Sequence, residues 1–135
     1  MSQRRKRVLI VDLDETVLIR LECLLEDAGC DTCTTWNVAE AVRLFTGDGF
    51  DFVLIGDHPP ELDAEKILRE LEVRNPDCRR LVLKPIARES DRERFQSVGA
   101  SVVIAKRDLS QIVGRLWDDP GPTTVNQLNL RKIAS

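Results

Sequence analysis

The sequence predicts an α/β fold built on a doubly wound, five-stranded parallel sheet in which a helix follows each strand. Short, continuous apolar runs recur along the chain, and such runs are typical of strands that are buried on both faces of a sheet. Stretches with apolar residues at helical spacing separate the runs, which is the pattern of repeated β-α units. The five predicted strands cover residues 8–11, 31–35, 52–55, 81–83 and 102–105.

The helices are expected to begin at capping residues, whose side chains accept hydrogen bonds from the free backbone N–H groups of a first turn. The expected starts are Asp14, Asn37, Asp63, Ser90 and, for the last helix, either Asp108 or Ser110. Ser90 forms a full capping-box pattern with Glu93. Gly29 and Gly99 follow the apolar faces of the first and fourth helices and predict where these helices end.

Right-handed crossovers place such strands in the spatial order 2-1-3-4-5. The winding reverses between strands 1 and 3, and open parallel sheets bind their ligands at the carboxyl ends of the strands at this reversal. The candidate site residues at the strand ends are Asp12, Leu13, Asp14, Gly56, Asp57, His58, Lys84 and Lys106.

The composition of the chain excludes some classes of protein and favours others. A chain of 135 residues with 42% apolar and 32% charged residues is expected to fold as one domain. A net charge of −3 and an aromatic content of 4%, with no Tyr, disfavour nucleic-acid binding. The N-terminus has no secretion-signal pattern and no apolar run is long enough to span a bilayer, so we expect a cytoplasmic protein that binds no membrane.

Composition also divides the chain into segments. The expected segments are a basic N-terminal arm (1–6), a folded domain (7–117) and a linker with a tail (118–135). A Pro- and Gly-containing sequence interrupts the β-α pattern after Trp117. Apolar residues then recur at loosely helical spacing at Val125, Leu128 and Ile133. Two interpretations stay open for this part: a frayed tail, or the start of a further domain.

The cysteines and the single histidine do not predict a cofactor or a metal. Cys30 and Cys33 form a CxxC, but it lies in a Thr-rich strand, whereas a redox CxxC usually opens a helix. A zinc site needs further ligands, and His58 is the one histidine of the sequence. We therefore expect free thiols, an exposed His58 in a loop, and no cofactor.

The stretch from Arg7 to Trp117 resembles the receiver domain of two-component response regulators, a CheY-like member of the flavodoxin-like folds. The resemblance rests on the first strand with Asp12, the third strand 50–55, Pro60 with Asp63, and Gly99 before the fifth strand with Lys106 after it. It implies a domain in which a histidine kinase donates a phosphoryl group to an Asp at the end of strand 3. In the family, that Asp and an acidic pair after strand 1 hold Mg²⁺.

The sequence departs from this family pattern at the residues that carry the chemistry. Gly56 stands at the acceptor position and Leu13 at the second acidic position. Lys84 replaces the expected hydroxyl residue, Val103 the aromatic switch and Arg107 the usual Pro. Of the active constellation, Asp12 and Lys106 remain.

These replacements predict a degenerate receiver, or pseudo-receiver. Asp12 with Lys84 and Lys106 sums to +1, whereas three carboxylates and one lysine sum to −2, so the pocket is not expected to attract Mg²⁺. A lysine is expected to pair with Asp12 in the place of the metal. We expect no enzyme activity, and a phosphorylation-independent protein-interaction module in a signalling system.

Two alternatives stay open. A bulge in strand 3 could bring Asp57 into the acceptor position, because a one-residue slip reverses side-chain direction. The run from Asp12 to Thr16 also resembles the DxDxT motif of haloacid-dehalogenase-like phosphatases, in which Asp12 would be the nucleophile and Asp14 the acid–base.

The expected partner is another signalling protein: a kinase, an output domain or a regulator, with a homodimer as a further possibility. The receiver resemblance implies a binding face over the fourth helix, the fifth strand and the fifth helix. Mixed charge along these segments fits a specific contact. The expected face residues are Arg92, Arg94, Val103, Arg107 and Arg115.

Overall fold

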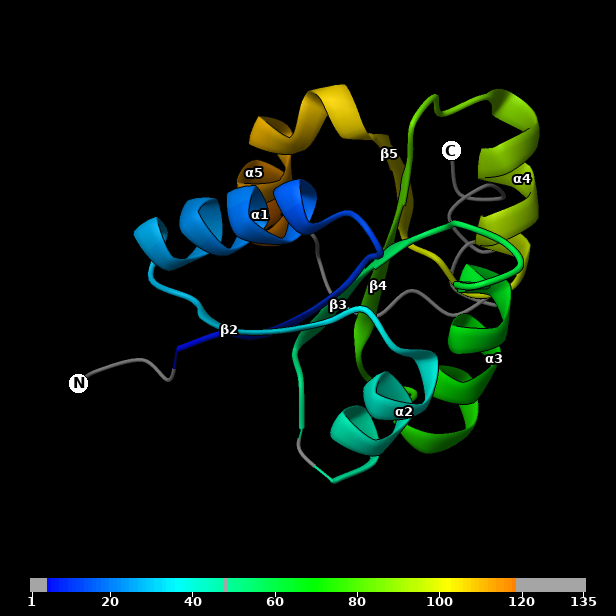
Figure 1. Ribbon diagram of the computed structural model, residues 1–135, viewed down its shortest axis with the longest axis horizontal. Coiled ribbons are helices and arrows are strands. Elements are labelled where there is room, and N and C mark those ends of the chain that lie inside the picture. The colour runs from blue at the N-terminus through cyan, green and yellow to red at the C-terminus, as the bar shows by residue number, and fades with distance from the viewer. Residues whose placement is uncertain (1–4, 48, 119–135) are drawn as a thin grey trace, which may run out of the picture.

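A computed structural model describes residues 5–47 and 49–118 of the chain (Figure 1). Five parallel strands form one sheet in the order β2-β1-β3-β4-β5, which confirms the predicted fold class and strand order. The strands are β1 (Arg7–Val11), β2 (Asp31–Thr35), β3 (Phe52–Gly56), β4 (Arg79–Lys84) and β5 (Val102–Ala105). The helices are α1 (Glu15–Asp27), α2 (Val38–Gly47), α3 (Ala64–Arg74), α4 (Glu89–Ser97), the 3₁₀ helix η1 (Lys106–Gln111) and α5 (Ile112–Asp118).

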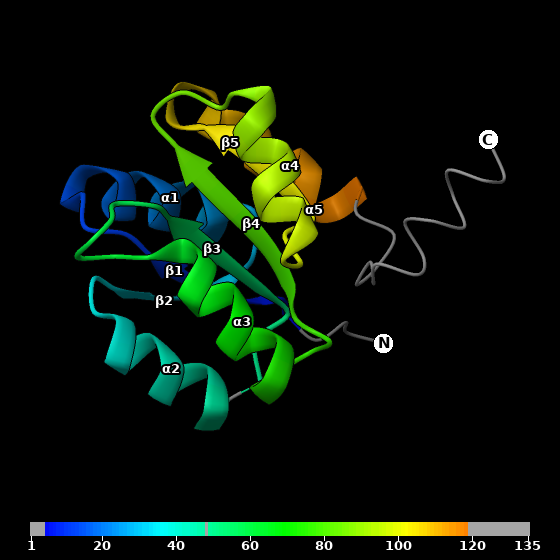
Figure 2. The same ribbon diagram turned by 90° about the vertical axis from the view of Figure 1, so that its right-hand side faces the viewer.

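Helices cover both faces of the sheet, as Figures 1 and 2 show. On one face, side chains of α1 and α5 such as Leu21 and Ile112 pack in one cluster with Ile10 of β1. On the other face, Phe45 of α2 and Phe95 of α4 pack with strand residues that point the opposite way. Consecutive strand residues therefore enter different clusters, and this explains why the central strands are continuously apolar.

Capping hydrogen bonds fix the starts of three helices as predicted. The Asp14 carboxylate accepts from the backbone N–H of Thr16 at 3.0 Å at the start of α1. Asn37 Oδ1 accepts from Glu40 N at 2.9 Å before α2. Asp63 accepts from Glu65 N at 3.1 Å before α3. Gly29 and Gly99 have φ values of 87° and 106° after α1 and α4, a conformation that glycine adopts without steric cost.

The predicted starts of the last two helices are wrong. α4 begins at Glu89, one residue before Ser90, because the Asp91 carboxylate accepts from the backbone N–H of Arg88 at 3.1 Å. Neither Asp108 nor Ser110 starts α5, since both lie within η1 and the α-helix begins only at Ile112.

None of the four cysteines, all of which lie within the described residues, forms a disulfide. Cys30 and Cys78 are both buried, and burial raises the pKa of the Cys78 thiol to about 12. Burial is also the largest cause of the raised pKa of Cys30, which directly precedes β2. These two thiols therefore remain protonated at neutral pH, which disfavours thiolate chemistry.

Parts of the predicted segments fall outside the described residues. They are residues 1–4 of the basic arm and 119–135 of the linker and tail, with Val125, Leu128 and Ile133. Within the described ranges, no helix has the length and apolar character that crossing a membrane requires.

Candidate functional site

Asp12 lies directly after β1, at the carboxyl edge of the sheet where the winding reverses. The side chain is fully buried. Its backbone N–H donates to the carbonyl of Thr35 at 3.1 Å, which continues the pairing of β1 with β2. Its Oδ1 accepts from the backbone N–H of Asp14 at 2.9 Å. The strand and the turn into α1 thus hold the carboxylate in one position.

The Asp12 carboxylate occupies the space beside Gly56, the last residue of β3. A Cβ built on Gly56 would overlap Asp12 Oδ2 and would also lie 3.0 Å from Oδ1. Any side chain at position 56 would therefore require the Asp12 carboxylate to move. Glycine at this position is what permits the close approach of the two strand ends.

Lys106 and His58 complete a cluster around Asp12. Lys106 Nζ lies 3.1 Å from Asp12 Oδ2 and 3.2 Å from Oδ1. His58 Nε2 lies 2.7 Å from Asp12 Oδ1 and 2.8 Å from Lys106 Nζ. We refer to Asp12, His58 and Lys106 as the charge cluster. Asp12 is thus paired with a lysine, Lys106, at the carboxyl edge of the sheet.

The expectation of an exposed His58 without carboxylate neighbours is wrong. Its side chain is 26% exposed and contacts the buried Asp12. The cause is the loop after β3, which folds back on itself. The backbone groups of His58 and Leu62 exchange hydrogen bonds of 2.8 and 2.9 Å, and this bridge holds His58 beside the end of β1.

Asp57 and Lys84 form a second pair. Asp57 Oδ2 lies 3.1 Å from Lys84 Nζ, and Asp57 Oδ1 accepts from the backbone N–H of Ala64 at 3.1 Å, at the start of α3. Asp57 is buried. The charge of +1 predicted for the pocket counted Asp12, Lys84 and Lys106 and left this carboxylate out. Asp57 and Asp12 together balance Lys84 and Lys106, so the sum of these four groups is zero and not +1.

The register of β3 gives Asp57 and Gly56 different directions. β3 pairs with β4 without interruption, from Phe52 opposite Arg79 to Gly56 opposite Leu83. The bulge that would slip Asp57 into the position of Gly56 is therefore absent from this described strand. Asp57 faces α3 and Lys84, whereas position 56 faces Asp12.

The donor set does not fit Mg²⁺, which prefers several carboxylate and water oxygens in octahedral geometry. Both oxygens of Asp12 already face Lys106 or His58, and Asp57 is engaged elsewhere. Leu13 offers no ligand and is 37% exposed. Among the residues that the structure describes, no group of three or more His, Cys, Asp or Glu side chains could hold a metal.

Asp14 has a structural role that differs from the one in a phosphatase motif. Its carboxylate caps α1 and accepts from Thr16 N. The second Asp of the DxDxT pattern is thus engaged at the start of a helix.

The residues expected on the binding face are not all on one surface. Val103 is buried at 2% exposure and packs with Phe95, so the inclusion of Val103 in a surface is wrong. Arg94 Nε lies 3.3 Å from Glu65 Oε1, and so Arg94 faces α3 and not α5. Arg92 donates to the carbonyl of Ala87 at 3.2 Å.

Two further residues of the expected face are Arg107 and Arg115. Arg107 is 83% exposed and lies 3.9 Å from Asp108. The side chain of Arg115 lies outside the described part of the chain.

Comparison with known proteins identifies the family. The family model described as "Response regulator receiver domain" matches residues 8–116. The chain is a response regulator receiver domain. It is therefore a signalling domain of two-component systems, a class that interacts with kinases and output domains.

Curated relatives include the transcriptional regulatory protein PrrA of Mycobacterium tuberculosis and of Mycobacterium bovis. Each is 31% identical over 111 residues, which cover 82% of this chain and 48% of the relative. The chain thus spans about half the length of these curated relatives.

Solved receiver structures share the fold at lower identity. The receiver domain of Francisella response regulator 1452 superposes with a TM-score of 0.76 at 20% identity, over 83% of this chain and 93% of that one. A response regulator from Thermotoga maritima gives 0.77 at 20% identity, over 84% and 96%. An orphan response regulator of H. pylori gives 0.74 at 19% identity, over 84% and 97%.

Sequence reasoning placed the strand ends correctly but missed two contacts of the site. It singled out His58 and Asp57 without assigning partners to them. The sequence signal for these contacts was the position of the two residues. Asp57 and His58 follow the end of β3 by one and two residues, and β3 neighbours β1. The contact of His58 with Asp12 joins distant segments of the chain. It could be predicted only by knowing how the 58–62 loop folds back.

Proposed function

We propose that this receiver domain is degenerate and acts as a phosphorylation-independent protein-interaction module. One observation carries the proposal: the carboxylate of Asp12 fills the space that a side chain at position 56 would need. The place of the phosphoryl acceptor is thus occupied by a group from the neighbouring strand. The acceptor position has neither an oxygen nucleophile nor room for one.

The charges around this position support the same proposal. A phosphoryl donor and its Mg²⁺ would need Asp12 to exchange Lys106 and His58 for the metal. Removing one partner from a buried ion pair costs about 3–5 kcal/mol. The charge cluster therefore competes with metal binding at Asp12.

The proposed partner is another signalling protein, such as a kinase, an output domain or a regulator, or a second copy of this chain. Its binding face would lie over α4, β5 and α5. Arg107 is 83% exposed there and faces the neighbouring Asp108 at 3.9 Å. We expect Arg107→Glu with Arg115→Glu to weaken partner capture or self-association while the unfolding midpoint stays unchanged. If partner capture is unchanged and the protein is a monomer at all concentrations, the binding face lies elsewhere.

The decisive experiment is intact-mass analysis after incubation with Mg²⁺ and acetyl phosphate. We expect no phosphoryl adduct, while a phosphorylatable receiver in the same buffer acquires one. The matched variant is Asp57→Asn. An adduct on the wild type that this variant abolishes would overturn the proposal in favour of Asp57 as the acceptor.

The same experiment tests the phosphatase alternative. An adduct on Asp12, together with turnover of a phosphoester substrate, would assign the chain that activity instead. A titration with Mg²⁺ provides an independent check, because a ligand that binds the folded state raises the unfolding midpoint. We expect millimolar Mg²⁺ to leave the midpoint unchanged.

A further inference from the structure

β2 forms one edge of the sheet and, among the described strands, pairs with β1 alone (Figure 1). The pairing is parallel and uninterrupted from Asp31 to Thr35. These five residues include no Lys, no Pro and no β-bulge, which are common protections of an exposed edge. The one charged residue of β2, Asp31, lies 3.1 Å from Arg5. An unprotected edge of this kind is a template for pairing with a further strand.

The backbone groups on the outer edge of β2 belong to Thr32 and Thr34. Asp31 N donates to the carbonyl of Lys6 at 2.9 Å, so the backbone groups of Asp31 face β1. Successive residues of a strand direct their N–H and C=O groups to alternate sides. Thr32 and Thr34 therefore direct theirs away from β1, and two donors and two acceptors are available to an added strand.

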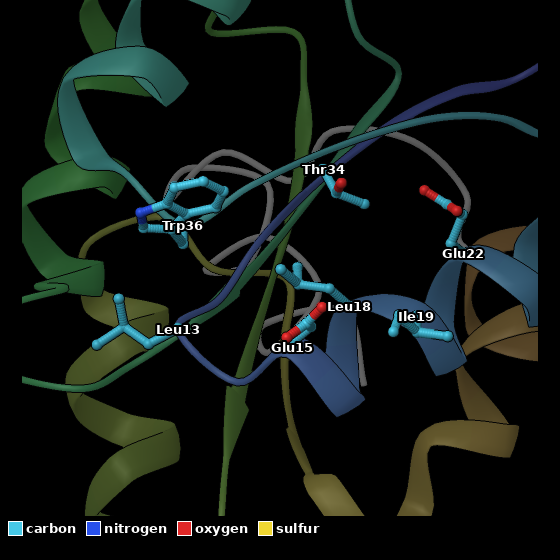
Figure 3. A pocket seen from close by; sticks show the side chains of 7 residues that line it. All are labelled: Leu13, Glu15, Leu18, Ile19, Glu22, Thr34 and Trp36. Carbon is cyan, nitrogen blue, oxygen red and sulfur yellow. The ribbon is translucent and has the colours of Figure 1, made fainter.

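An open groove of about 600 Å³ lies beside this edge, between β2 and α1 (Figure 3). Thr34 and Trp36 line it from the β2 side, and Glu15, Ile19 and Glu22 line it from α1. Side chains alternate between the two faces of a sheet. A strand that pairs with β2 would therefore place every second side chain on the face of this groove.

The groove exposes large apolar side chains. Trp36 is 69% exposed, Ile19 56% and Leu13 37%. Contiguous apolar surface of this kind, rimmed by polar groups, marks a binding site more often than scattered single residues do. These side chains are open to solvent in the chain by itself, so a partner that covers them gains the free energy of their burial.

Two carboxylates give the groove its charge. Glu15 and Glu22 lie two turns apart on α1, which is about 10 Å along the helix axis. No basic side chain lines the groove in the described part of the chain. Two side chains four residues apart in a strand share a face and lie about 13 Å apart. The complementary strand thus carries two basic residues at this spacing with an apolar residue midway, and opposed charges fix its register.

We propose that β2 accepts an extended segment of another protein as an additional strand, whose backbone pairs with Thr32 and Thr34. An apolar side chain of the segment covers Trp36, and the basic side chains that flank it pair with Glu15 and Glu22. The inference goes beyond the proposed function, because this face lies at the opposite edge of the sheet from β5. The segment binds here whether or not the domain accepts a phosphoryl group.

The test uses the full chain and the synthetic peptide acetyl-Thr-Lys-Thr-Leu-Thr-Lys-Thr-amide, whose Lys and Leu side chains share one face of a strand. NMR follows the hydrogen exchange of single backbone amides with and without the peptide. At saturating peptide we expect exchange of the Thr32 and Thr34 amides to slow by about tenfold or more, because both become hydrogen bonded. The amide of Cys33 faces β1 in both states and is the internal control.

Two variants test the charges. Glu15→Lys with Glu22→Lys should raise the Kd of the peptide about tenfold, which corresponds to ~1.4 kcal/mol. The same variant should bind the peptide in which Glu replaces both lysines, since both sets of charges are then swapped. The matched control is Glu61→Lys with Asp77→Lys, which changes the net charge equally. These two exposed residues lie in the loops before and after α3, across the sheet from α1, so the Kd should stay unchanged.

Four outcomes would overturn the proposal. Unchanged exchange of Thr32 and Thr34 at millimolar peptide would show that the edge accepts no strand. Binding that shifts the Trp36 resonances while both amides still exchange rapidly would show that the groove takes a helix or another conformation instead. Slow exchange of both amides without peptide, at high protein concentration, would assign the edge to a second copy. An equal Kd for the wild type and the Glu15→Lys, Glu22→Lys variant would show that these carboxylates do not pair with the segment.

Discussion

Asp12 and Leu13 are consecutive residues, yet they belong to two regions with opposite properties. Asp12 is fully buried, and its carboxylate contacts side chains from two distant segments of the chain, at His58 and Lys106. Leu13 is 37% exposed and lines a groove whose apolar side chains face solvent. The Asp12 carboxylate has its charge partners within the fold, although Oδ2 accepts no hydrogen bond from the described residues, whereas the apolar side chains beside it face solvent. The difference shows that a charge inside a fold is accompanied by its partners, whereas an apolar side chain at the surface can remain exposed.

The largest expected effect comes from Asp12→Ala. This change leaves Lys106 beside the sheet edge without its carboxylate, and breaking a buried pair costs about 3–5 kcal/mol. Urea unfolding of both proteins measures the difference. Asp14→Ala is the matched control, because it removes a neighbouring but exposed carboxylate that caps α1, at a cost of about 0.5–2 kcal/mol. A smaller loss for Asp12→Ala than for Asp14→Ala would contradict the burial of the charge cluster.

Gly56→Ala is expected to have the next largest effect. The new Cβ would overlap the Asp12 carboxylate, and overpacking of this kind costs about 1–3 kcal/mol. The control is the double variant with Asp12→Ala, in which the obstructing group is absent. We expect the cost of Gly56→Ala to be smaller in that background, which a double-mutant cycle measures as a coupling between the two positions. Additive costs would mean that the two groups do not compete for space.

The smallest effect is expected in the groove. Ile19→Ala removes a side chain that is 56% exposed, so the free energy of unfolding should change by no more than about 0.5 kcal/mol. Leu21→Ala lies on the same helix, but Leu21 is fully buried, and there we expect a loss of about 2–5 kcal/mol. A large loss for Ile19→Ala would show that the side chain is covered by another part of the chain.

Local sequence signals predicted the fold because they report local physics. Continuous apolar strands and the Asp14 and Asp63 caps depend on neighbouring residues, and the sheet order then follows from the handedness of the crossovers. The start of α4 was missed because Ser90 and Asp91 both offer acceptors at plausible spacing. The sequence does not specify which of the two registers has the better hydrogen bond.

The site was less predictable because its contacts join distant segments. Lys106 was foreseen from the family resemblance, and its position fits a partner of Asp12. His58 and Asp57 were not assigned their partners, since these depend on how the loop after β3 folds back and on the direction of each side chain. Burial of Val103 was missed because the resemblance supplied its role, whereas the alternation of β5 sets its direction.

The close approach of Gly56 and Asp12 has an evolutionary consequence. An Asp introduced at position 56 would collide with the carboxylate of Asp12, which Lys106 and His58 hold in place. We therefore expect the single substitution Gly56→Asp to lower stability before it can restore chemistry. Under the proposed function, restoring phosphorylation would therefore require coordinated replacements at several positions, because Gly56→Asp alone conflicts with Asp12.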